Sequence, residues 1–154
     1  AEFDSVTFCL SKGLAGPVGS LVCGDQQFID RARRSRKMLG GGMRQAGVIA
    51  AAGIVALQTM IERLSEDHIN AKRLAEGLAQ LPGLSIDPNH IETNIVYVDL
   101  PEIEATELVA QLRKAGILVN GMDNWVRLVT HYGITAEDID IALDAIEVTL
   151  RGMS

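Results

Sequence analysis

Three consecutive glycines, Gly40–Gly42, constrain this chain of 154 residues more than any other feature of its sequence. Residues 26–38 before them have the composition of a helix, and each glycine in a helix interior costs about 1 kcal/mol relative to alanine. The glycines must therefore end that helix, and Met43 and Arg44 follow them directly. Because glycine lets a backbone approach a ligand closely and a guanidinium holds a phosphate through two parallel hydrogen bonds, the segment is either a phosphate-binding element or a tight corner between helices.

A lysine stands at the end of the first predicted strand. Residues 6–10 and 19–23 are rich in strand-forming side chains and are separated by a turn that contains Gly16 and Pro17. Lys12 lies where the first strand gives way to the turn, between Ser11 and Gly13, which leave its amine accessible. This placement suits a Schiff-base nucleophile, and its alternative is a solvated surface lysine.

The longest apolar run, residues 46–57, predicts a buried helix, because it is well short of the roughly 18 residues needed to cross a membrane. Helical spacing of apolar residues continues to Pro82 and Gly83. We expect this long helical stretch to break between Ser65 and His68. No association with a membrane is expected.

The last third of the sequence predicts a small α+β domain. Strands are expected at 94–99, 117–119 and 126–129, with a turn at 120–124 between the last two. A helix is expected at 104–115, ended by Gly116. A second helix should begin after Thr135, whose hydroxyl and the Asp138 carboxylate have the spacing of a capping box.

Charge is distributed unevenly along the chain. Residues 1–44 carry seven basic and four acidic side chains, whereas the net charge of the whole chain is -6. A basic stripe on residues 31–37 would suit nucleic acid, but aromatic residues make up only 4% of the chain and its remainder is acidic, so nucleic acid is not expected as a partner. Cys9 and Cys23 lack the spacing of a metal site, so no metal is expected, and they predict buried, reduced thiols in a cytoplasmic protein.

Two motifs together resemble a known family. They are Val6-Thr7-Phe8-Cys9-Leu10-Ser11-Lys12-Gly13-Leu14, followed by Pro17-Val18-Gly19-Ser20, and Arg36-Lys37-Met38-Leu39-Gly40-Gly41-Gly42-Met43-Arg44-Gln45. In this order they closely resemble the low-specificity L-threonine aldolases, and the resemblance returns at residues 126–131. The family usually has glycine where this chain has Ala15, which bears on the local turn geometry and not on the lysine.

The resemblance implies roles for four residues. Lys12 would form the Schiff base with pyridoxal 5'-phosphate (PLP). Lys37 and Arg44 would reach a cofactor phosphate, that of a neighbouring subunit, and Arg127 would bind the substrate carboxylate. Strand periodicity agrees for Arg127, since it places the guanidinium on the opposite face from Val126 and Leu128; the alternative is a surface arginine.

The resemblance also implies an α/β fold: the C-terminal part of a fold type I PLP-binding large domain over residues 1–65, then a small α+β domain over 66–154. The implied partners are the N-terminal half of the same enzyme, an amino-acid substrate and further copies in a dimer or tetramer. The implied reaction is the retro-aldol cleavage of L-threonine or L-allo-threonine to glycine and acetaldehyde. The alternatives are another PLP-dependent lyase reaction such as β-elimination, or a non-catalytic oligomerisation fragment.

Overall fold

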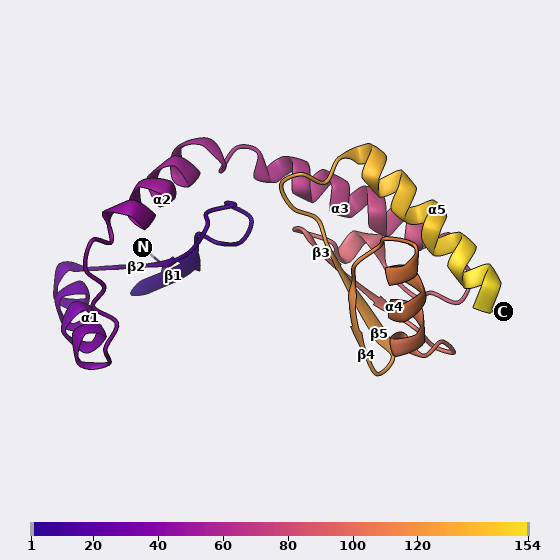
Figure 1. Cartoon of the computed structure of the whole chain (residues 1–154), viewed down its shortest axis with the longest axis horizontal. Helices are drawn as coiled ribbons and strands as arrows, with labels where there is room; N and C mark the ends of the chain where they lie inside the picture. The colour runs from indigo at the N-terminus through magenta and orange to yellow at the C-terminus, as the bar shows by residue number, and fades with distance from the viewer. Residues whose placement is uncertain (1, 154) are drawn as a thin grey trace. The chain divides into compact units, whose positions relative to one another are not determined.

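A computed structural model describes residues 2–153 and divides the chain into two compact units, residues 1–64 and 65–154. The division lies one residue from the boundary expected from the sequence. The first unit holds a two-stranded sheet, β1 (Ser5–Cys9) and β2 (Ser20–Gly24), and two helices, α1 (Gln26–Met38) and α2 (Gly47–Thr59). The second unit holds the remainder: α3 (Leu64–Leu78, which begins at the boundary), a short 3-10 helix (Pro88–His90), β3 (Ile95–Asp99), α4 (Ala105–Lys114), β4 (Asn120–Met122), β5 (Trp125–Val129) and α5 (Ala136–Met153) (Figure 1).

The first unit has a small core. Strands β1 and β2 pair antiparallel, with Val6 opposite Cys23 and Phe8 opposite Leu21. Among the described residues of this unit, Leu10, Leu14 and Ala56 form the cluster of buried apolar residues. The strands and α1 fall where the sequence predicts them, and α1 matches residues 26–38 at both ends.

Helix α2 is not the buried helix that its apolar sequence predicts. Gly53 and Ala56 are its buried residues, whereas Val48 is 79% exposed and Ile54 and Val55 are more than half exposed. The prediction fails because apolar composition predicts burial only where other elements cover the helix, and the first unit supplies cover for one narrow stripe. None of the single helices within residues 2–153 is long and apolar enough to cross a membrane, although α2 and α3 together, as a bent pair, reach that length and composition.

The break in the long helical stretch lies earlier than predicted. Helix α2 ends at Thr59 and α3 begins at Leu64, so the interruption spans residues 60–63 and not 65–68. The polar residues that suggested the break are the first turn of α3, where Glu66 and Asp67 lie. Carboxylates are favourable there because they meet the positive end of the helix dipole.

The second unit is built on a three-stranded antiparallel sheet in the order β3-β5-β4. One face of the sheet carries Val96, Val98, Val126 and Leu128, which are all buried. The three long helices cover that face and contribute most of the remaining core: Ala71, Leu74, Ala75, Leu78, Ala105, Leu108, Leu112, Ile139, Ile146 and Leu150. The core therefore lies on one side of the sheet, and the other face of β3 and β5 stays partly exposed.

The hairpin β4–β5 corrects the prediction for residues 117–124. The expected strand 117–119 is irregular, and the expected turn contains strand β4. The register pairs Met122 with Trp125, so Asp123 and Asn124 alone form the turn, with Asp123 at a φ of 53°. Gly121 allows this pairing, because a Cβ there would lie 2.8 Å from Cγ1 of Val126. The glycine that suggested a turn serves close packing within a strand instead.

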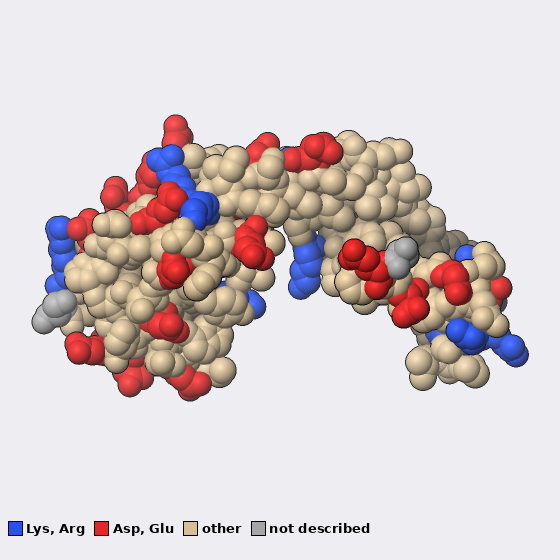
Figure 2. All heavy atoms as spheres, turned by 180° about the vertical axis from the view of Figure 1, so that it is seen from behind, with Lys and Arg blue, Asp and Glu red and all other residues tan. Residues whose placement is uncertain are grey.

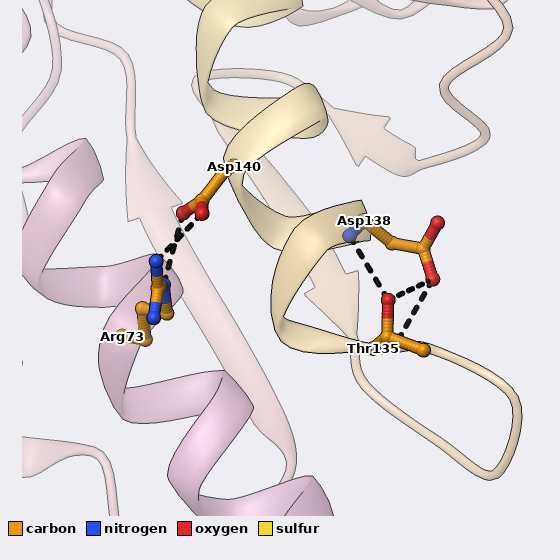
Figure 3. Close-up of polar contacts among 4 residues, drawn as sticks. All are labelled: Arg73, Thr135, Asp138 and Asp140. Carbon is orange, nitrogen blue, oxygen red and sulfur yellow. Dashed lines mark hydrogen bonds and ion pairs between the residues drawn. The ribbon is translucent and has the colours of Figure 1, made fainter.

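Helix α5 begins at the predicted capping box (Figure 3). The backbone N–H of Asp138 donates to Oγ1 of Thr135 at 3.2 Å, and the backbone N–H of Thr135 donates to Oδ2 of Asp138 at 2.8 Å. The Thr135 hydroxyl also donates to Oδ2 of Asp138, at 2.8 Å. The bond from the Thr135 backbone has the larger effect and the bond from its hydroxyl the next, and both hold the pKa of the Asp138 carboxyl below its ordinary value of 3.8. Arg73 of α3 also binds Asp140 of α5 through two nitrogens, with Nη2 to Oδ2 at 2.6 Å.

Charge over the second unit is mainly negative, as the excess of acidic residues after residue 44 predicts. Residues 65–154 carry fifteen acidic and six basic side chains. On the face drawn in Figure 2, acidic side chains predominate over this unit. Cys9 and Cys23 are free, as expected, but both are exposed, because the small core of the first unit packs against Phe8 and Leu21 of the sheet and not against either cysteine. The predicted cytoplasmic localisation stays a prediction.

Candidate active site

Lys12 lies in a closed turn between β1 and β2. The turn is held by three backbone hydrogen bonds: Leu10 N–H to Gly19 O at 2.9 Å, Gly16 N–H to Leu10 O at 2.9 Å, and Ala15 N–H to Lys12 O at 2.8 Å. Lys12 is exposed. Within residues 2–153 its amine makes no hydrogen bond or ion pair. The turn therefore presents a primary amine on an ordered backbone.

The turn is anchored on both sides of Lys12. Leu10 and Leu14 are buried and contact Ala56 of α2 in the core of the first unit. The contact is close, since a Cβ on Gly53 of α2 would lie 2.9 Å from Cδ1 of Leu10. Two buried leucines thus hold the ends of a short segment whose middle residue reaches solvent, which fixes the backbone from which the amine extends.

Ala15, the residue at which this chain departs from the resembling family, has a left-handed backbone. Its φ is 53°, and it is one of three non-glycine residues with positive φ in the part of the chain that the structure describes. The left-handed conformation costs an L-residue about 1–2 kcal/mol, and glycine pays almost none of it. The turn keeps the geometry that glycine would favour and stores strain three residues after the lysine.

The three glycines have separate structural roles. Gly40, at φ 81°, is the left-handed residue after the end of α1. Its N–H donates to Lys37 O at 3.2 Å, and the N–H of Gly41 donates to Arg36 O at 2.8 Å. These two bonds form a Schellman motif, which satisfies carbonyls that the helix end leaves open. The expected interruption of the helix is confirmed, and it ends in a defined cap.

Gly41 and Gly42 permit two basic side chains of α1 to lie against the backbone. A Cβ on Gly41 would meet Cγ of Arg36 at 3.0 Å. A Cβ on Gly42 would meet Cδ of Lys37 at 2.9 Å and its Nζ at 3.3 Å. The ammonium group of Lys37 thus lies beside the glycine turn, and Arg44 follows this turn as an exposed residue.

Arg127 lies in the middle of β5, the central strand of the second unit's sheet. Val126 and Leu128 on either side are buried, so Arg127 points to the face that the helices leave open, as strand periodicity predicts. Its register partners are Tyr97 on β3 and Asn120 on β4. Among the residues that the structure describes, Nε of Arg127 is the buried side-chain polar atom for which no hydrogen-bond partner is present.

The predicted site residues thus fall in both units. Lys12, Lys37 and Arg44 belong to the first unit and Arg127 belongs to the second. Within residues 2–153 no group of three His, Cys, Asp or Glu side chains is placed to hold a metal ion. The arrangement offers an amine, two cations beside a glycine turn, and a guanidinium on an open sheet face.

Sequence reasoning missed the aromatic residues beside Arg127. Tyr97 and Trp125 lie on the same open face, and their rings meet edge to face with centroids 5.4 Å apart. A signal was present, because Val96 and Val98 mark the buried face of β3 and Tyr97 stands between them. The pairing of β3 with β5 was needed to place it opposite Arg127.

The family model for beta-eliminating lyases matches residues 1–101. The chain belongs to the beta-eliminating lyase family. It is also 43% identical over 154 residues to low-specificity L-threonine aldolase 1 of Arabidopsis thaliana, covering 97% of this chain and 43% of that protein. Identity to the low-specificity L-threonine aldolase of Escherichia coli K12 is 46% over 136 residues, covering 88% of this chain and 40% of that protein. The chain therefore spans less than half the length of these relatives, and the resemblance noted from the sequence is confirmed.

Solved structures confirm the fold class. The Sphingomonas wittichii serine palmitoyltransferase matches with a TM-score of 0.79 at 21% identity, over 98% of this chain and 40% of that one. A PLP-dependent aminotransferase from Streptococcus suis matches with a TM-score of 0.74 at 19% identity, over 97% of this chain and 42% of that one. The chain has the α/β fold of part of a PLP-dependent fold type I enzyme.

Proposed function

We propose that this chain is the C-terminal part of a PLP-dependent aldehyde-lyase, which cleaves L-threonine or L-allo-threonine into glycine and acetaldehyde. The observation that carries the proposal is the exposed amine of Lys12 on an anchored turn, in a chain related to threonine aldolases. The reaction, the substrate and the assembly go beyond the similarity itself, because the relatives are more than twice as long as the matched segment.

The residues present fit PLP by their chemistry. The cofactor has an aldehyde, which a lysine amine binds covalently, and a phosphate, which needs cations. Lys12 supplies the amine, and Lys37 and Arg44 supply the cations beside glycines that leave room for a close approach. When bound, PLP supplies an electron sink for the electron pair of the broken Cα–Cβ bond.

In this proposal Lys12 holds the cofactor in one place between turnovers. Its backbone is anchored on both sides by Leu10 and Leu14, so the base of the lysine side chain is already placed when the amine reacts. Lys37 and Arg44 bind a phosphate, which we assign to the cofactor of a neighbouring subunit in a dimer or tetramer.

Arg127 binds and orients the substrate carboxylate. A guanidinium is planar and always charged, and it can donate two parallel hydrogen bonds to a carboxylate. Holding the carboxylate fixes the orientation of the substrate about Cα, and so decides which bond of Cα is aligned for cleavage. This orientation separates cleavage of the Cα–Cβ bond from other reactions of the same substrate. The buried, unbonded Nε of Arg127 supports a role beyond that of a solvated surface arginine.

We also propose that an N-terminal half covers the first unit. Two-stranded sheets are marginally stable alone, and β1 and β2 carry exposed Val6 and Val22. Val48, Ile54 and Val55 of α2 are exposed as well. An apolar surface of this kind in a small unit with three core residues favours a covering segment.

A second candidate reaction is β-elimination, which the description of the matched family favours. The two reactions give different products from L-threonine: aldol cleavage gives glycine and acetaldehyde, whereas elimination gives 2-oxobutanoate and ammonia. A non-catalytic oligomerisation fragment would give neither.

The test is to incubate the complete protein with PLP and L-threonine or L-allo-threonine and to quantify these four products. The proposal predicts equimolar glycine and acetaldehyde, lost in Lys12→Ala. Stoichiometric ammonia and 2-oxobutanoate would show that the reaction is β-elimination and not aldol cleavage. Activity that survives in Lys12→Ala would show that Lys12 does not have the proposed role.

A further inference from the structure

Tyr97 is the direct cross-strand neighbour of Arg127. In the antiparallel pair β3–β5 the two residues face each other, with Ile95 opposite Val129 and Asp99 opposite Trp125 on either side. Directly opposed residues of such a pair have Cβ atoms about 4.5–5.5 Å apart on the same face. Tyr97 therefore stands beside the Arg127 side chain, although it is 53% exposed itself.

The guanidinium of Arg127 is sheltered unevenly. Nε is buried and has no hydrogen-bond partner within the described residues, and it is the one guanidinium nitrogen of Arg127 in that state. The side chain as a whole is only partly buried. Its two terminal nitrogens therefore face the open side of the sheet, while Nε lies among its neighbours on that face.

Trp125 holds the ring of Tyr97. Their centroids lie 5.4 Å apart at an interplanar angle of 64°, an edge-to-face contact of the kind that aromatic pairs prefer. Trp125 precedes Arg127 by two residues and lies on the same face of β5. The tyrosine is thus in contact with Trp125 and lies directly across the strand pair from Arg127.

We infer that Tyr97 is a positioning residue for Arg127. The Tyr97 ring keeps water from Nε and restricts the guanidinium plane, so that the two terminal nitrogens are presented end-on to a carboxylate. An ion pair at a site with less water is screened less, and an arginine that is already ordered loses less entropy when it binds. This inference rests on the proposed function, in which that carboxylate belongs to an α-amino acid.

The ring, and not the hydroxyl, carries this role. The hydroxyl of Tyr97 makes no hydrogen bond within the described residues, whereas the ring makes the contact to Trp125. Phenylalanine at position 97 should therefore preserve the role, whereas leucine should not, although leucine retains much of the apolar bulk. Asn120, on the other side of Arg127, carries no aromatic ring and does not share the role.

The test measures glycine affinity by calorimetry, and kcat and KM for L-threonine, in the complete PLP-loaded protein. Tyr97→Leu and Tyr97→Ala should raise the glycine Kd and the KM by about tenfold and leave kcat within about twofold, whereas Tyr97→Phe should match the wild type. In an Arg127→Lys background the same Tyr97→Ala change should have less than about a third of that effect, because the residue acts through the guanidinium.

Tyr132→Ala, at the other tyrosine of the chain, is the matched control and should leave KM unchanged. Three outcomes would each overturn the inference and leave the proposed function standing. They are a wild-type KM and glycine affinity in Tyr97→Ala, a loss of glycine affinity in Tyr97→Phe as large as that in Tyr97→Ala, and an undiminished effect of Tyr97→Ala in the Arg127→Lys background. Failure of the wild-type protein to cleave L-threonine would overturn both.

Discussion

Replacing Gly42 by alanine should weaken PLP binding without unfolding the protein. The new Cβ would lie 2.9 Å from Cδ and 3.3 Å from Nζ of Lys37. Carbon atoms in good contact lie about 3.5–4.0 Å apart, so the lysine stem must move by roughly 1 Å. A flexible stem moves at little cost to the fold, and its ammonium moves with it.

The expected size of the effect follows from the hydrogen bond that this movement disrupts. A charge-assisted bond spans about 2.7–2.9 Å, so a shift of that size breaks it. Hydrogen bonds to charged groups contribute about 1.5–3 kcal/mol. A tenfold change in affinity corresponds to about 1.36 kcal/mol, so the PLP affinity should fall by roughly 10- to 150-fold.

The assay is an absorbance titration of the complete apoprotein with PLP. Gly47→Ala is the matched control, because no atom lies within 4 Å of a Cβ at Gly47, and it should bind PLP as the wild type does. Equal affinity of Gly42→Ala and Gly47→Ala would refute the reasoning and return the glycines to the role of a helix corner.

Three further changes test other parts of the account. Ala15→Gly should raise the free energy of unfolding by about 0.5–1 kcal/mol in denaturant titrations, because relief of the left-handed strain exceeds the added entropy of the unfolded chain; a destabilised variant would show that the turn is unstrained. Thr135→Ala should cost about 1 kcal/mol at pH 7 through the lost cap. The native pKa of Asp138 lies below 3.8, so the stabilisation by its carboxylate is present above that pH and is lost as the pH falls through the native pKa; an Asp138→Ala penalty that stays equal at pH 7 and at a pH below the native pKa would contradict the capping box. Arg44→Ala should weaken PLP retention on dialysis by about 1.5–3 kcal/mol with an unchanged thermal midpoint, and unchanged retention would remove Arg44 from the phosphate.

Local signals predicted the elements that depend on local contacts. Helix α1 ends where Gly40 supplies a left-handed residue, and α5 begins where Thr135 and Asp138 cap each other. Both features are complete within a few residues of sequence. The open-face position of Arg127 was predictable for the same reason, since strand alternation needs only its two neighbours.

Features that depend on distant residues were missed. Gly121 indicates a turn by composition, and only its contact with Val126 shows why it belongs to strand β4. The exposure of Val48 on α2 depends on what covers that helix, which the helix sequence does not contain. The place of Tyr97 beside Arg127 follows from the register of two strands that are about thirty residues apart in sequence.

Borohydride reduction of the complete PLP-loaded protein, followed by digestion and mass spectrometry of the labelled peptide, tests the role of Lys12 most directly. The account predicts that the reduced cofactor is attached to the Lys12 side chain and that Lys12→Ala carries no label. A label on another lysine, or an unlabelled protein that still cleaves L-threonine, would contradict it.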